Sequence, residues 1–116
     1  MASSVSRHNY ASSLTELQRF REAKALSRRL TPVARRVLGE SNETTLRMKK
    51  IYAVALYQDP GATLGDLREA VTALEEIERI ARRVFGGSHP RTVRTEVSLR
   101  EARAVLRARE TPQERA

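Results

Sequence analysis

The sequence ARRVLGESNETTLR at residues 34–47 returns at residues 81–94 as ARRVFGGSHPRTVR. When residues 20–47 are laid over residues 67–94, an offset of 47, 11 of the 28 positions are identical. Composition alone does not produce so many identities, so the chain contains an internal repeat. A repeat of this period is typical of solenoids, in which helical units stack and bury one continuous core.

Upstream of this match the offset is shorter. The sequence YASSL at residues 10–14 matches YAVAL at residues 52–56 at an offset of 42. The additional residues of the longer offset must lie between the two matches, where residues 58–63 contain the turn sequence Asp-Pro-Gly. The underlying period is therefore 42 residues, which accommodates one pair of helices per unit.

The composition points to the same fold class. Ala, Leu, Glu and Arg make up 58 of the 116 residues, whereas Gly and Pro number only 5 and 4. Because these four residue types favour helices, an all-α fold is expected. The absence of cysteine excludes disulfide scaffolds, thiol catalysis and Cys-ligated zinc. Two histidines, His8 and His89, are too few for a His-based metal site, so we expect neither a metal nor a cofactor.

Apolar residues spaced three and four apart mark two long amphipathic helices, which end at Gly39 and Gly86. Shorter helices precede, separate and follow them. The sequence therefore predicts five helices, at about residues 4–16, 20–38, 42–58, 64–85 and 89–109.

Local signals refine the helix boundaries. Ser41 is expected to cap the third helix, and Thr63 to open the fourth in a variant of the capping box. Pro90 fits the first turn of the fifth helix, where its missing N–H costs nothing. Pro32 lies inside the second helix and should kink or break it.

The repeated linkers, LGESNE at 38–43 and FGGSHP at 85–90, resemble those of the tetratricopeptide repeats (TPRs) of kinesin light chains. That family also pairs a small residue in the first helix of a unit with Glu-Ala in the second. The pairing occurs twice, as Ala11 with Glu22-Ala23 and as Ala53 with Glu69-Ala70. The sequence departs from the family at Gln18, where the family has a turn glycine, and at Glu43, where the second linker has proline.

The resemblance implies an α-solenoid of antiparallel helix pairs with about two and a half TPR-like units. The units span about 1–41, 42–88 and 89–110 within one repeat domain at 1–110, and a disordered tail follows at 111–116.

In TPR proteins the first helix of each pair lines a concave groove, and the resemblance implies such a groove here. Arg47 and Arg94 share one repeat position and are expected to lie side by side in it. With Lys50 they would favour a carboxylate through charge-assisted hydrogen bonds, and Asn9 is available to a ligand backbone. The expected ligand-binding residues are thus Asn9, Arg47, Lys50 and Arg94. The alternative is that these arginines are ordinary exposed side chains.

No arrangement of residues suits catalysis, so the chain is not expected to be an enzyme. We predict a protein-interaction module, an adaptor or scaffold that binds a peptide or protein segment in its concave groove. The cationic groove residues and the net charge of +8 favour an acidic ligand. One alternative is a basic helical nucleic-acid-binding protein, although aromatics form only 4% of the chain. Another is a remnant of a longer repeat array without independent function. Self-association of the chain is also possible.

No secretory or membrane-spanning segment is evident, so no membrane partner and a cytoplasmic location are expected.

Overall fold

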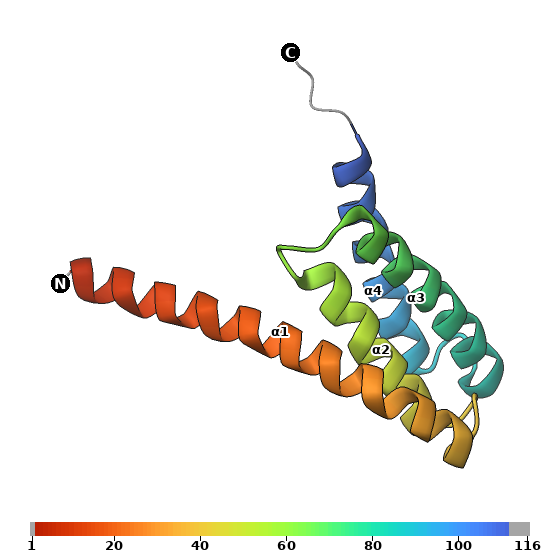
Figure 1. Cartoon of the computed structure of the whole chain (residues 1–116). Coiled ribbons are helices and arrows are strands. Elements are labelled where there is room, and N and C mark those ends of the chain that lie inside the picture. Colours follow the sequence, from red (N-terminus) through yellow and green to blue (C-terminus); the bar gives the residue numbers. More distant parts are fainter. Residues whose placement is uncertain (1, 112–116) are drawn as a thin grey trace.

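The computed structural model describes the backbone of residues 2–111 and the side chains of residues 18–111. This part of the chain folds into four helices and contains no strand, which confirms the all-α class. The helices are α1 (Ala2–Leu38), α2 (Glu43–Gln58), α3 (Leu64–Phe85) and α4 (Pro90–Glu110). The prediction of five helices was wrong, because the two expected at 4–16 and 20–38 form the single helix α1 (Figure 1). Residues 112–116 of the expected disordered tail lie outside the described residues.

Helix α1 continues because nothing in its sequence stops it. The position expected to hold a turn glycine is Gln18, which favours helix. Pro32, expected to kink or break the helix, lies within α1 without ending it. In the turn before this proline, Thr31 Oγ1 donates to the Ser27 carbonyl at 2.6 Å, and Ser27 Oγ donates to the Ala23 carbonyl at 2.6 Å. These bonds reach the Ala23 and Ser27 carbonyls, whereas Pro32 removes the N–H that would reach the Arg28 carbonyl, so the helix continues past one lost bond. The first unit therefore has no helix pair.

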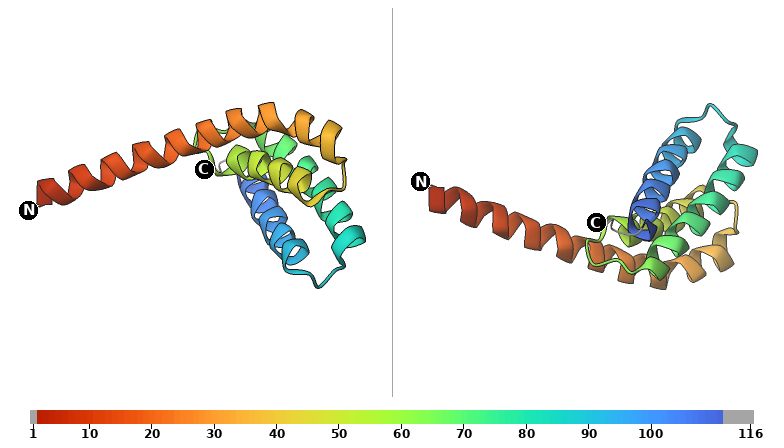
Figure 2. Two further views of the ribbon diagram at one scale, coloured as in Figure 1. Left: turned by 90° about the horizontal axis from the view of Figure 1, so that it is seen from below. Right: turned by 90° about the horizontal axis from the view of Figure 1, so that it is seen from above.

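The other three helices pack together, and α1 packs against α2 alone through its C-terminal half. The N-terminal half of α1 projects beyond the other helices (Figures 1 and 2). Fully buried alanines from each helix of the group, Ala53, Ala70 and Ala102, allow close approach of the backbones. The larger side chains of the core are Leu46, Leu56, Tyr57, Leu67, Leu74, Ile77, Ile80 and Leu99.

The two linkers at the offset of 47 have the same backbone geometry. Gly39 and Gly86 have φ of 97° and 96°, and each donates its amide at 3.0 Å to the carbonyl four residues earlier. Gly86 has ψ of 157°, a combination that only glycine adopts without strain. Helix ends at these glycines were predicted, and the structure confirms them.

The helix starts that follow are also equivalent. Asn42 Oδ1 accepts from the Thr44 amide at 2.8 Å, and His89 Nδ1 accepts from the Arg91 amide at 3.1 Å. The N-cap of α2 is therefore Asn42, not Ser41 as the sequence suggested; both are good caps, and α2 simply begins one residue later. The predicted capping box at Thr63 and the proline in the first turn of α4 are confirmed.

We predict that Tyr57→Phe weakens the attachment of α2 to α4. Tyr57 Oη donates to Glu101 Oε1 at 2.7 Å, and burial together with this carboxylate raises the pKa of Tyr57 to about 12. Loss of the bond should lower the free energy of unfolding at pH 7 by about 1 kcal/mol. A raised folded-state pKa contributes stability that is present below pH ~10 and is lost as the pH rises through the folded value.

Urea unfolding followed by circular dichroism should therefore show a steeper loss of stability between pH 10 and about 12 for the wild type than for Tyr57→Phe. Tyr52→Phe, which removes an exposed bond to Glu69, is the control and should have a smaller effect. Parallel pH curves for the wild type and Tyr57→Phe would contradict this account.

Candidate functional site

A pocket of about 230 Å³ lies where α2 and α4 run side by side over α3. Its wall is cationic on both sides, with Arg47 and Lys50 from α2 and Arg91 and Arg94 from α4. Its base is apolar and comes from Leu46 together with three residues of α3, namely Ile77, Ala81 and Phe85. Glu43 and Thr95 complete the lining.

The structure brings three of the predicted ligand-binding residues into this pocket. Arg47 and Arg94 face it from neighbouring helices because equivalent linkers start α2 and α4 in the same register. Lys50 lies one turn along α2 from Arg47. The side chain of the fourth predicted residue, Asn9, lies outside the described residues.

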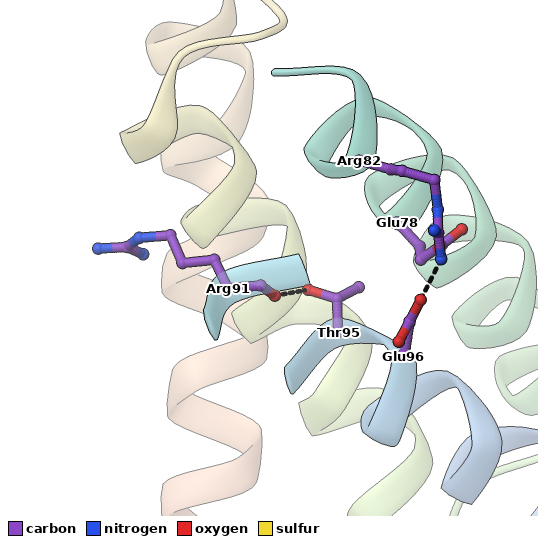
Figure 3. A network of polar contacts seen from close by, with 5 residues as sticks. All are labelled: Glu78, Arg82, Arg91, Thr95 and Glu96. Atoms are coloured by element: carbon purple, nitrogen blue, oxygen red, sulfur yellow. Dashed lines mark hydrogen bonds and ion pairs between the residues drawn. The ribbon is translucent and has the colours of Figure 1, made fainter. Parts of the chain in front are cut away.

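Arg91 is a pocket residue that the sequence analysis missed. It lies one turn before Arg94 on the same face of α4, and this i, i+3 spacing is the signal that could have identified it. Its guanidinium forms an ion pair with Glu43 at 2.5 Å, which joins the first turns of α2 and α4. Figure 3 shows the Arg91 side chain pointing away from Glu96 and Arg82, which lie on the other side of α4.

The pocket carries more positive than negative charge. Four cationic side chains line it, with Glu43 as the one carboxylate of the lining. The pKa of Lys50 is lowered below its ordinary value, first by burial and then by the charges of Arg94 and Arg91. A lowered lysine pKa means that the protonated ammonium is held at a cost, which an anion bound beside it would offset.

The apolar base is fixed by packing. Leu46 and Ile77 are buried in the core, and the ring of Phe85 stacks on His89 with centroids 4.7 Å apart and planes at 25°. A shallow apolar base with a few convergent charged groups suits a ligand that combines a carboxylate with an apolar side chain.

The arginines on the α3–α4 surface have a different environment. Arg82 donates to Glu78 at 2.6 Å and also pairs with Glu96, so that it ties α3 to α4 (Figure 3). Arg103 pairs with Glu75 at 2.9 Å across the same two helices. These guanidiniums already have carboxylate partners, whereas Arg47 and Arg94 have no ion pair within the described part of the chain.

The described residues include no group of three His, Cys, Asp or Glu side chains that could hold a metal ion. Nor do they include a helix with the length and apolarity needed to cross a membrane. Comparison with protein-family models, curated proteins and solved structures finds no significant match to this chain.

We predict that Lys50→Met stabilises the free protein. The folded-state pKa of Lys50 is lowered, so protonated Lys50 opposes folding at neutral pH, and this cost disappears as the pH rises towards the ordinary value of 10.5. Removal of the charge should raise the free energy of unfolding at pH 7 by about 0.5–1 kcal/mol, the usual scale of improved surface charge.

Thermal unfolding at pH 7 measures the change, with Lys24→Met on α1 as the control for loss of one positive charge elsewhere. An equal effect at the two lysines would show that only net charge matters, and destabilisation by Lys50→Met would contradict the electrostatic account of the pocket.

Proposed function

We propose that this chain is a non-enzymatic interaction module of the TPR type, an adaptor or scaffold that works in the cytoplasm. It binds an acidic peptide or protein segment in the pocket between α2 and α4. The observation that carries the proposal is the convergence of Arg47, Lys50, Arg91 and Arg94 around an apolar base.

The repeat supports this assignment. In the TPR-like division of the chain, α2 and α4 are the first helices of successive units, which are the helices that line the groove in that family. The matching glycine linkers support solenoid-type stacking of these units.

The chemistry of the pocket defines the ligand. Arg47 and Arg94 would hold a carboxylate, from an acidic side chain or a chain terminus, through charge-assisted hydrogen bonds of ~1.5–3 kcal/mol each. An apolar side chain next to that carboxylate would contact Phe85 and Ile77. A concave apolar base fits such a peptide better than it fits a phosphate backbone, which is recognised chiefly by charge.

We predict that Arg47→Glu and Arg94→Glu each weaken ligand binding by about tenfold or more, since one charge-assisted bond becomes a repulsion. The probe is a fluorescein-labelled peptide of glutamates that ends in leucine with a free carboxylate, and fluorescence anisotropy gives its affinity. The same peptide with an amidated terminus shows whether the terminal carboxylate or the acidic side chains are recognised.

Arg100→Glu is the matched control, because Arg100 is exposed on α4 and has no ion pair within the described residues. Arg82 is unsuitable, since its reversal would place a carboxylate beside Glu78 and Glu96. Equal losses of affinity for Arg47→Glu, Arg94→Glu and Arg100→Glu would mean that the peptide responds only to the net charge of the protein. Tighter binding of a random-sequence RNA with a steep salt dependence would support the nucleic-acid alternative instead. Absence of binding to both probes would overturn the proposed function.

A further inference from the structure

Helix α1 exposes apolar residues whose repeat equivalents are buried. Leu30 and Val33 are 38% and 44% exposed, whereas Ile77 and Ile80, at the same repeat positions of α3, are 2% and 7% exposed. Helix α3 lies in a core shared with α2 and α4, but α1 packs against α2 alone. One face of α1 therefore lacks the partner that the corresponding face of α3 has.

A groove of about 370 Å³ runs along this region between α1 and α2. Arg47 and Lys50, which also line the pocket between α2 and α4, border this groove. The rest of its lining comes from Phe20, Ala23, Ile51, Val54, Ala55 and Gln58. The offset of 47 carries these positions onto Leu67, Ala70, Ser98, Glu101, Ala102 and Val105 of α3 and α4.

Those equivalent positions form the surface on which α2 packs. Leu67, Ala70 and Ala102 are core residues shared with α2, and Glu101 accepts the hydrogen bond from Tyr57 of α2. The groove between α1 and α2 is thus the repeat equivalent of the place that α2 occupies between α3 and α4. A helix would pack at this place if the pattern of the repeat continued.

The chain itself contains the helix that matches this groove. Residues 4–16 are the repeat equivalent of α2 at the offset of 42 and share its Tyr-Ala-x-x-Leu sequence. They cannot turn back onto their own groove, because α1 runs unbroken through Gln18 and carries them away from the other helices (Figures 1 and 2). Each molecule therefore presents both a groove and its matching helix, held apart by one continuous helix.

We propose that two copies of the chain exchange these segments, so that residues 4–16 of each molecule occupy the α1–α2 groove of the other. The two α1 helices then run antiparallel. Ala11 of one chain lies against Ala23 of the other, as expected from the fully buried equivalents Ala53 and Ala70. This pairing places the two-fold axis of the dimer near residue 17. Both copies use the same surface at the interface, so the assembly ends at two molecules.

The mass of the intact chain in solution tests the exchange. Light scattering coupled to gel filtration should give twice the 13.1 kDa of one chain. Leu30→Glu should yield a monomer with unchanged helix content, because Leu30 is 38% exposed within one molecule. Val97→Glu, on α4 at 40% exposure, is the matched control and should remain dimeric. A monomeric wild-type chain at every accessible concentration would overturn the proposal.

Cysteine cross-linking tests the geometry, since the chain has no cysteine of its own. Single variants Ala11→Cys and Ala23→Cys, unfolded, mixed and refolded together, should form a disulfide-linked heterodimer on oxidation. Like positions would be about 18 Å apart along the antiparallel helices, so neither variant alone should cross-link. Ala11→Cys mixed with Arg100→Cys is the control and should not cross-link.

A double variant, Ala11→Cys with Ala23→Cys, separates exchange from closure within one chain. Exchange predicts linkage between chains, at twice the mass. An intrachain disulfide at the mass of one chain would show that the segment folds back on its own groove, and this result would reject the exchange.

Discussion

The positive φ of Gly39 and Gly86 determines how the rest of the molecule is arranged. Each glycine turns the chain at the end of a long helix, and the next helix starts three or four residues later at a side-chain cap. A Cβ at either position would meet nothing within 4 Å, so the need for glycine is conformational and not a matter of space. Because the two turns are equivalent, α2 and α4 begin in the same register. This register is the reason that Arg47 and Arg94 face one pocket.

Carboxylates pair with the cations that join helices, whereas the cations at the pocket are in excess over carboxylates. Lys49 and Lys50 are neighbours on α2 but have opposite surroundings. Lys49 is buried and donates to Glu40 at 2.7 Å, a bond that lowers the pKa of Glu40. Lys50 faces the pocket, where burial and two arginines lower its own pKa. The chain thus places carboxylates where they hold helices together and leaves an excess of cations at the pocket.

Much of this arrangement could be predicted from sequence because it depends on local chemistry. Helix ends at the two glycines follow from a backbone conformation that other residues avoid, and the shared position of Arg47 and Arg94 follows from the repeat. Arg91 was missed because its repeat equivalent is Thr44, so the repeat shows no pair of arginines at that position. Sequence did not distinguish Ser41 from Asn42 as the N-cap of α2, because the two residues are adjacent and both favour that position.

The continuity of α1 was missed for a different physical reason. The repeat argument assumed that residues 4–16 pair with the helix that follows them, as α2 pairs with α3. That pairing needs a chain reversal near residue 18, and Gln18 offers none of the backbone freedom that a glycine would. The helix propensity of the residues near position 18 therefore outweighs the additional burial of apolar surface that a hairpin would have provided.

The proposed exchange reconciles the five predicted helices with the four observed. A hairpin and an antiparallel pair of α1 helices bury the same surfaces, and they differ only in whether the chain turns near residue 18 or continues. In the exchanged dimer each half contains α1 to α4 together with residues 4–16 of the other copy, which is a stack of five helices. Repeat units are stable only when neighbours cover their apolar faces, and one face of α1 has no such neighbour within the described part of a single molecule. In the proposed dimer a second copy supplies that neighbour, so the helix that interrupts the repeat within one molecule is the element by which two molecules would complete it.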